Sequence, residues 1–133
     1  MPLFLQVDVT KPSEIEKAAE YTKATYGSLD LLINNAGLLH PSGRGETRLS
    51  DVKLEDLQTL YAVNAAGPLL MARHFAPLMQ KGSGTFGAPN HGHKSMLVNI
   101  TARAGSIEDN KLGGWYGYRY DTKCLKILCF LPF

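Results

Sequence analysis

The sequence has few cysteines, no long apolar run and no excess of either charge. Its two cysteines, Cys124 and Cys129, do not have Cys-x-x-Cys spacing, and nothing indicates a disulfide framework. No run approaches the roughly 20 apolar residues of a membrane-spanning helix. The apolar start at Leu3–Leu5 is too short for the core of a signal peptide. These absences favour a reducing compartment, and we expect a cytoplasmic protein.

The charges are balanced and mixed along the chain. There are 14 Lys and Arg residues against 12 Asp and Glu residues, which leaves a formal net charge of +2. This balance indicates neither a nucleic-acid partner nor a membrane partner. The 133 residues are enough for one modest domain with its own core.

The first part of the chain has the pattern of a parallel strand–helix–strand unit. Leu3–Val9 predicts a strand, and Leu29–Asn34 contains the unbroken apolar run typical of a strand buried on both faces of a sheet. Between them, a helix is predicted to begin near Pro12 and to stop at Gly27.

The middle of the chain predicts a loop, a long helix and another buried strand. Leu38–Asp51 is polar and contains Pro and Gly, which predicts a surface loop. Apolar residues then recur at helical spacing over about 53–80. Pro68 in this helix has no N–H, so the carbonyl of Asn64 loses its usual partner and we expect a kink there. Ser95–Thr101 predicts the strand.

Three short segments carry a resemblance to a known family. Asn34–Gly37, Asn-Asn-Ala-Gly, follows a predicted strand, where open α/β sheets bind ligands, and it resembles a hallmark of the short-chain dehydrogenase/reductase family. Tyr61–Pro68 resembles the family's helix segment with a functional asparagine, and Gly113–Arg119 resembles the approach to its catalytic tyrosine. The likeness is strongest to carbonyl-reductase-like members related to sniffer and C-factor.

The resemblance implies a nicotinamide cofactor, NAD or NADP, and hydride transfer between it and a small carbonyl or alcohol substrate. In the family an Asp-Val or Asp-Leu pair contacts the cofactor's adenine. The implied cofactor contacts of this chain are Asp8, Val9, Asn35, Ala36 and Gly37. Family members also have a glycine-rich turn that holds the cofactor's pyrophosphate at a helix N-terminus, and no segment of this sequence resembles it.

Two further patterns are rejected as binding motifs. Gly82–Gly87 satisfies Gly-x-Gly-x-x-Gly, but it follows a helix rather than a strand, and no helix follows it. His91 and His93 lie close together without a third ligand, so we expect no metal site.

By resemblance the catalytic residues are Asn64, Tyr118 and Lys123. The backbone carbonyl of Asn64 would hold a water in a proton relay, and Tyr118 would be the general acid/base. The family's Tyr-x-x-x-Lys spacing lets the lysine lower the pKa of the phenol. Lys123, however, is five residues after Tyr118, and one extra residue turns a helix by roughly 100°. Either a bulge takes up the insertion or the pair is broken.

The family's carbonyl-polarising serine also has no direct counterpart. Its strand commonly ends in Asn-x-Ser-Ser, and the second serine position is Ala102 in this chain, which has no donor. Thr101 and Ser106 are the nearby hydroxyls, and neither is at the matching place.

The implied fold is α/β, a partial Rossmann-like doubly wound parallel sheet without its first two and its C-terminal strands. Residues 1–133 would form a single truncated NAD(P)-binding domain. Leu3–Val9, Leu29–Asn34 and Met96–Thr101 correspond to strands 3, 4 and 5 of the order 3-2-1-4-5-6. The first has lost both neighbours, so we expect it to dock beside Leu29–Asn34 or to stay poorly ordered.

Two classes of function remain. The first is a short-chain dehydrogenase/reductase-type oxidoreductase whose activity in this chain is impaired or absent. The second is a non-catalytic fragment: an interaction or dimerisation module that forms homo- or hetero-oligomers through the helices of Asn64 and Tyr118, or an unstable truncated product. The apolar tail after Lys123 does not resemble the family, and we expect a truncated or alternatively read product.

Overall fold

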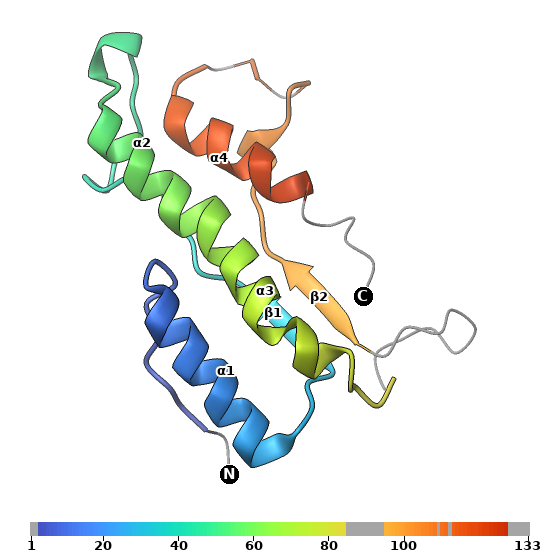
Figure 1. Ribbon diagram of the computed structural model, residues 1–133. Helices are drawn as coiled ribbons and strands as arrows, with labels where there is room; N and C mark the ends of the chain where they lie inside the picture. Colours follow the sequence, from blue (N-terminus) through green and yellow to red (C-terminus); the bar gives the residue numbers. More distant parts are fainter. Residues whose placement is uncertain (1–2, 85–94, 109, 112, 128–133) are drawn as a thin grey trace.

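The computed structural model describes residues 3–84, 95–108, 110–111 and 113–127, which form a mixed α/β arrangement (Figure 1). Its helices are α1 (Pro12–Tyr26), α2 (Leu54–Tyr61), α3 (Gly67–Met79) and α4 (Tyr116–Ile127). Its strands are β1 (Leu31–Asn34) and β2 (Met96–Asn99). Two short 3-10 turns, η1 (Leu49–Asp51) and η3 (Arg103–Gly105), and a π-helical turn, η2 (Ala62–Ala66), complete the order. None of the described helices is long and apolar enough to cross a membrane.

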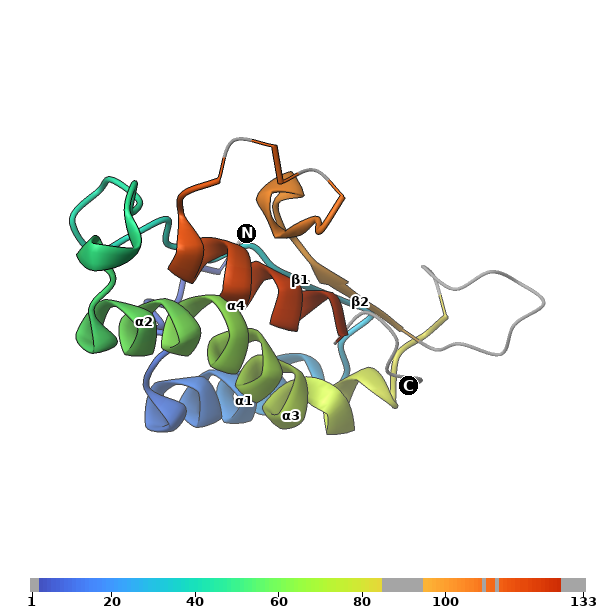
Figure 2. The same cartoon turned by 90° about the horizontal axis from the view of Figure 1, so that it is seen from above.

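The sheet consists of β1 and β2, which pair in parallel from Leu31 opposite Met96 to Asn34 opposite Asn99. Figure 2 shows α1 and α3 together on one side of these strands. Leu32 faces the helices and is buried, whereas the next residue, Ile33, is 52% exposed. The prediction of a strand buried on both faces is therefore wrong for β1. Alternate side chains of a strand point to opposite faces, and the described helices cover one face.

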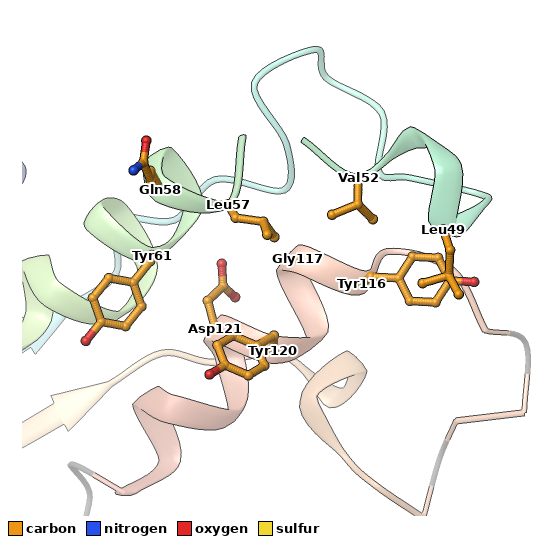
Figure 3. A pocket seen from close by; sticks show the side chains of 9 residues that line it. All are labelled: Leu49, Val52, Leu57, Gln58, Tyr61, Tyr116, Gly117, Tyr120 and Asp121. Atoms are coloured by element: carbon orange, nitrogen blue, oxygen red, sulfur yellow. The ribbon is translucent and has the colours of Figure 1, made fainter. Parts of the chain in front are cut away.

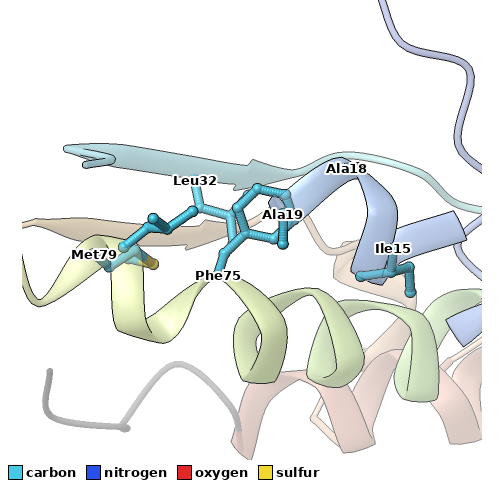
Figure 4. Packing of buried hydrophobic residues seen from close by; sticks show 7 residues of the cluster. Ile15, Ala18, Ala19, Leu32, Phe75 and Met79 are labelled. Atoms are coloured by element: carbon cyan, nitrogen blue, oxygen red, sulfur yellow. The ribbon is translucent and has the colours of Figure 1, made fainter. Parts of the chain in front are cut away.

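The hydrophobic core lies between β1, α1 and α3 (Figure 4). Phe75 and Met79 of α3 pack beneath Leu32, and α1 contributes residues at helical spacing. Two of these are alanines, and their small side chains let α1 approach α3 closely. The buried members are Ile15, Ala18, Ala19, Leu32, Phe75, Leu78 and Met79.

The predicted strand Leu3–Val9 is not a strand in the structure. Among the described residues β1 pairs only with β2, so the predicted docking of this segment beside β1 is also wrong. The segment instead lies alongside α1, where Leu5 and Val7 line a shallow pocket with α1 side chains. Phe4 is 88% exposed. With no neighbouring strand to accept its backbone hydrogen bonds, apolar alternation alone does not make this segment part of a sheet.

The predicted long helix is present as α2, η2 and α3 in succession, and its irregularity falls where Pro68 removes a backbone donor. In the π turn, the N–H of Gly67 donates to the carbonyl of Ala62, five residues earlier. The helix thus continues past the proline with one wider turn, and Asn64 lies within that turn.

The segment Leu38–Asp51 is only partly a surface loop, which corrects the sequence prediction. Glu46 is 4% exposed, and its Oε1 accepts the N–H of Gly117 at 3.2 Å. The backbone carbonyl of Glu46 also accepts the N–H of Trp115 at 2.7 Å. These contacts draw the loop against the start of α4. At the end of α1, by contrast, the prediction is confirmed: Gly27 has φ 77° and closes the helix.

Candidate functional site

A small cavity lies just beyond the carboxyl ends of β1 and β2, where open α/β sheets bind ligands. It has a volume of about 210 Å³. Its lining comes from the segments after both strands, from η2 and from α4: Asn35, Ala36, Gly37, Leu38, Leu39, Asn64, Ile100, Thr101, Tyr118 and Thr122. Five predicted site residues, Asn35, Ala36, Gly37, Asn64 and Tyr118, are thus brought together here.

Asn64 is the best-connected polar side chain of this cavity. It is 3% exposed, and its amide bonds the backbone of Leu38 on both sides, with Nδ2 to the carbonyl at 2.7 Å and Oδ1 to the N–H at 2.8 Å. Nδ2 also donates to Oδ2 of Asp121 at 2.7 Å. Asn64 therefore holds the loop after β1 and helix α4 at the same time. Gly37 passes close by, and a Cβ there would lie 3.6 Å from Asn64 Oδ1.

A second asparagine ties the strand ends together. Nδ2 of Asn34 donates to Oδ1 of Asn99 at 2.8 Å and to the carbonyl of Pro68 at 3.3 Å. These bonds join the last paired residues of β1 and β2 to the start of α3. The loop Asn35–Gly37 accordingly leaves the sheet from a fixed position.

Helix α4 presents Tyr118 and Thr122 to the cavity, but not Lys123. The helix is regular from Tyr116 to Ile127, so it does not take up the extra residue as a bulge. Thr122, four residues after Tyr118, lines the same cavity, and its Oγ1 donates to the carbonyl of Tyr118 at 2.5 Å. Lys123 is exposed and does not line the cavity. The extra residue places threonine at the helical position one turn from the phenol.

The surroundings of Tyr118 favour its neutral form. Burial raises the pKa of the phenol, and the nearby charge of Asp121 raises the pKa further. A neutral phenol is a hydrogen-bond donor and a proton donor. In this arrangement Tyr118 is suited to donate to an oxygen atom and poorly suited to take a proton near neutral pH.

A second cavity, of about 510 Å³, opens on another side of Tyr118. Its lining combines apolar and cationic side chains: Leu39, Ala102, Arg103, Ala104, Lys111, Trp115, Tyr118 and Arg119. Ala102 is here, whereas Thr101 lines the smaller cavity and its hydroxyl donates to the carbonyl of Thr122 at 3.4 Å. Ser106 lines neither of the two.

Arg119, which was not among the predicted site residues, holds the loop before α4 in place. Its guanidinium donates to the carbonyls of Gly114 at 2.8 Å, Ala104 at 3.0 Å and Gly113 at 3.3 Å. These bonds hold η3 and residues 113–114 against the helix beside Tyr118. The local signal is weak, because only the fold brings these carbonyls together.

Asp8 and Val9 lie apart from the cavity. Oδ1 of Asp8 accepts the N–H and the hydroxyl of Thr10 at 2.9 and 2.7 Å, and these bonds lower the pKa of the carboxyl. The side chain of Val9 packs against Gly67, where an added Cβ would lie 3.0 Å from Val9 Cγ2. In this structure both residues serve the turn before α1 and its contact with the long helix.

Two buried carboxyl groups near α4 were not predicted from the sequence. Asp121 is 1% exposed and Glu46 is 4% exposed. One oxygen of each, Oδ1 and Oε2, has no hydrogen-bond partner. Burial raises the pKa of Asp121 to about 6, the bond from Asn64 opposes the shift, and the charge of Glu46 adds to it. The apolar residues around them belong to other elements, so sequence spacing alone does not reveal this burial.

The cavity is too small to enclose a whole dinucleotide. A cavity of about 210 Å³ is smaller than the roughly 300–1,000 Å³ of typical ligand pockets. Within the described ranges, no group of three or more His, Cys, Asp or Glu residues could hold a metal ion. His91 and His93, for which no metal site is expected, lie outside the described residues. The same is true of residues 85–87 and of the tail beyond residue 127.

Comparisons with known proteins agree with this architecture. Residues 2–102 match the family model described as enoyl-(acyl carrier protein) reductase. The chain is 32% identical over 116 residues to momilactone A synthase of Oryza sativa subsp. japonica, with 76% of this chain and 41% of that protein covered.

Two solved structures extend the likeness. NADPH-bound carbonyl reductase from chicken fatty liver aligns with a TM-score of 0.79 and 29% identity, over 95% of this chain and 49% of that one. Carbonyl reductase Sniffer of D. melanogaster aligns with a TM-score of 0.80 and 24% identity, over 93% and 50%. The expected α/β, partial Rossmann-like fold is thereby confirmed. The chain spans half or less of each of these three proteins.

Proposed function

This chain belongs to the short-chain dehydrogenase/reductase family, and on that premise we propose that it carries the substrate side of a NAD(P)-dependent carbonyl or alcohol oxidoreductase site. The observation that carries the proposal is the position of Tyr118, which lines both the 210 Å³ cavity with Asn64 and the 510 Å³ cavity with Trp115. The similarity to a carbonyl reductase with bound NADPH supports NADP(H) as the cofactor to test first.

Each cavity has a proposed occupant. The smaller one receives the nicotinamide end of the cofactor, against the backbone of Asn35–Gly37. The larger one receives the substrate, with Leu39 and Trp115 as its apolar wall and a volume within the range of pockets for small molecules. The proposed substrate is therefore a carbonyl compound with an apolar or aromatic body.

The residues of the chain then have distinct roles. When bound, the cofactor supplies or accepts a hydride. Tyr118 donates a hydrogen bond, and finally a proton, to the substrate oxygen. Asn64 positions the loop Asn35–Gly37 through its two bonds to Leu38. Ala102 lines the larger cavity without a side-chain donor, so we assign the hydrogen bond to the substrate oxygen to Tyr118.

We expect this activity to be weak in the chain on its own. Lys123 is exposed and turned from the cavity, and the pKa of Tyr118 is raised rather than lowered. The phenolate is the form that would accept a proton from an alcohol, and a raised pKa makes this form scarce near neutral pH. Carbonyl reduction is accordingly the favoured direction, because there Tyr118 acts as the donor.

The test is a titration of the purified chain with NADPH and with NADH, followed by cofactor fluorescence and by reduction of an aromatic aldehyde. We expect saturable binding at or below millimolar cofactor. Ala36→Leu fills the smaller cavity and should abolish binding, whereas Ala24→Leu on the exposed side of α1 should not. Tyr118→Phe should retain binding and lose the reduction. Absence of binding by the unmodified chain at millimolar cofactor would refute the proposal.

A non-catalytic interaction role is the second candidate. It is favoured by Leu54, Tyr61 and Leu69, which lie seven and eight residues apart along α2 and α3 and are 67%, 50% and 47% exposed. Such spacing places apolar side chains on one side of a helix, as at interfaces with a partner helix. Light scattering over a range of protein concentrations tests it: self-association that Leu54→Glu and Leu69→Glu abolish would support this role, and a strictly monomeric chain would count against homo-oligomers.

A further inference from the structure

A third hollow lies between α2 and α4 and shares no lining residue with the cavity of Asn64 and Tyr118. It has a volume of about 910 Å³, within the range of pockets that bind small molecules. Figure 3 shows the side chains that line it: Leu49, Val52, Leu57, Gln58, Tyr61, Tyr116, Gly117, Tyr120 and Asp121.

The floor of this groove contains a carboxyl group with a free oxygen. Asp121 projects from α4 into the space between Leu57, Tyr61 and Tyr120 (Figure 3). The residue is 1% exposed, and while Oδ2 accepts a bond from Asn64, Oδ1 has no partner. A buried carboxylate oxygen without a partner is costly, and a ligand that donates to it removes that cost.

The walls suit a cation with an apolar body. None of the lining residues carries a positive charge, and the second buried carboxyl group, that of Glu46, stands on the same side of α4, where its Oε1 bonds the N–H of Gly117. Three tyrosine rings, those of Tyr61, Tyr116 and Tyr120, line the groove, and aromatic faces attract organic cations.

We propose that this groove is a binding site for an organic ammonium compound, whose cationic head pairs with Asp121 and whose apolar body lies against Leu57 and the tyrosine rings. An anion is excluded by the two carboxyl groups. A neutral molecule of the same shape gains the apolar contacts but leaves Asp121 without a counter-charge. The site is separate from the proposed cofactor cavity, so it can be tested independently of any oxidoreductase activity.

The experiment compares three molecules of nearly equal size: phenethylammonium, 2-phenylethanol and phenylacetate. Binding to the full chain is measured by calorimetry and by NMR shifts of the groove residues. We expect the cation to bind about tenfold or more tightly than the alcohol, the worth of one charge-assisted hydrogen bond, and phenylacetate to bind least. Equal binding of all three, or binding of none, would overturn the proposal.

Two variants locate the site. Asp121→Asn keeps the shape and removes the charge, so it should reduce the preference for the cation over the alcohol to about twofold or less. Tyr120→Ala changes a side chain that is 71% exposed, so folding is not at risk, and it should weaken the cation several-fold, whereas Tyr120→Phe, which keeps the ring, should not. If Tyr120→Ala leaves cation binding unchanged, the cation binds elsewhere and the assignment is wrong.

The acidity of Asp121 gives an independent readout. The titratable groups around it are Glu46, Tyr118 and the three groove tyrosines. Burial raises the pKa of Asp121 to about 6, so its carboxylate gains a proton as the pH falls below that value. Cation affinity should therefore fall between pH 7 and pH 5 in the unmodified chain and stay flat in Asp121→Asn. A second copy of the chain in the groove would appear by light scattering as a dimer that does not bind the cation, and that result would also overturn the proposal.

Discussion

Asn64 and Asp121, 57 residues apart in the sequence, share a hydrogen bond of 2.7 Å between Nδ2 and Oδ2 in the buried centre of the molecule. The side-chain amide of Asn64 also bonds Leu38: its Oδ1 accepts the backbone N–H of Leu38, and its Nδ2 donates to the backbone carbonyl of Leu38. One side chain therefore connects the loop after β1 with the helix that carries Tyr118. Changes at either partner should affect the stability of the fold and the geometry of the cavity together.

Replacing Asn64 with alanine should lower the free energy of unfolding by about 2–4 kcal/mol. It leaves the part-buried backbone groups of Leu38 and the buried Oδ2 of Asp121 without their partners. Urea unfolding measures the change. Asn35→Ala is the matched control, an exposed asparagine of the same cavity, and should change stability by less than about 0.5 kcal/mol. Equal effects of the two substitutions would show that the bonds of Asn64 add little.

The stability of the protein should depend on the protonation of Asp121. Its pKa is about 6 in the folded protein against an ordinary value of 3.8, so folding favours the protonated form. This contribution is fully present below the ordinary value and is lost as the pH rises through 6. Between pH 5 and pH 7.5 the free energy of unfolding should therefore fall relative to that of Asp121→Asn.

Comparing the two proteins isolates this group, because other ionisable residues are common to both. Three carboxyl groups have lowered pKa values: Asp8, Glu14 and Asp30. Their contribution to the free energy of unfolding rises with pH, and it does so at lower pH than the change at Asp121. Urea midpoints at half-unit pH steps give the difference. Parallel curves for the two proteins would contradict the assignment.

Lys123 should have little influence on Tyr118. Its side chain is exposed and does not line the cavity. Lys123→Met should therefore leave the pKa of Tyr118 unchanged and the affinity for NADPH unchanged within about twofold. Thr122→Lys places an ammonium group one turn from the phenol and should lower that pKa. NMR of labelled tyrosine, with Tyr118→Phe to assign the signal, measures both. A large upward shift in Lys123→Met would mean that the lysine reaches the phenol after all.

The contact between η3 and α4 should tolerate no added methyl group at Gly105. A Cβ there would lie 2.8 Å from Oγ1 and 3.2 Å from the backbone carbon of Thr122. Gly105→Ala should therefore cost about 1–3 kcal/mol of stability through overpacking. Gly37→Ala adds a methyl group 3.6 Å from its nearest neighbour, Asn64 Oδ1, and should change stability by less than about 1 kcal/mol. Thermal melts of the two variants measure the difference. An unchanged melting temperature for Gly105→Ala would show that the backbone at this contact shifts at little cost in free energy.

Much of the local structure follows from the order of residues along the chain. The proline at the start of α1 and the glycine at its end bound that helix as predicted, and Pro68 marks the irregular turn around Asn64. These features depend on backbone dihedral angles and on donors that a proline lacks, which are properties of neighbouring residues. Five of the residues that line the candidate cavity belong to segments that resemble the family's motifs, whereas Asp8, Val9 and Lys123 do not line it.

The rest depends on which segments pack together. Leu3–Val9 alternates like a strand, but strand formation needs a partner, and no described segment pairs with it. One inserted residue moves Lys123 away from Tyr118 and brings Thr122 to the cavity, because the angular position around a helix changes by roughly 100° per residue. The burial of Asp121 and Glu46 arises only where α2, α4 and the loop between β1 and η1 enclose them. Sequence thus set the elements and their motifs, whereas long-range packing set which side chains face a cavity, which lose water and hence which carry unusual acidity.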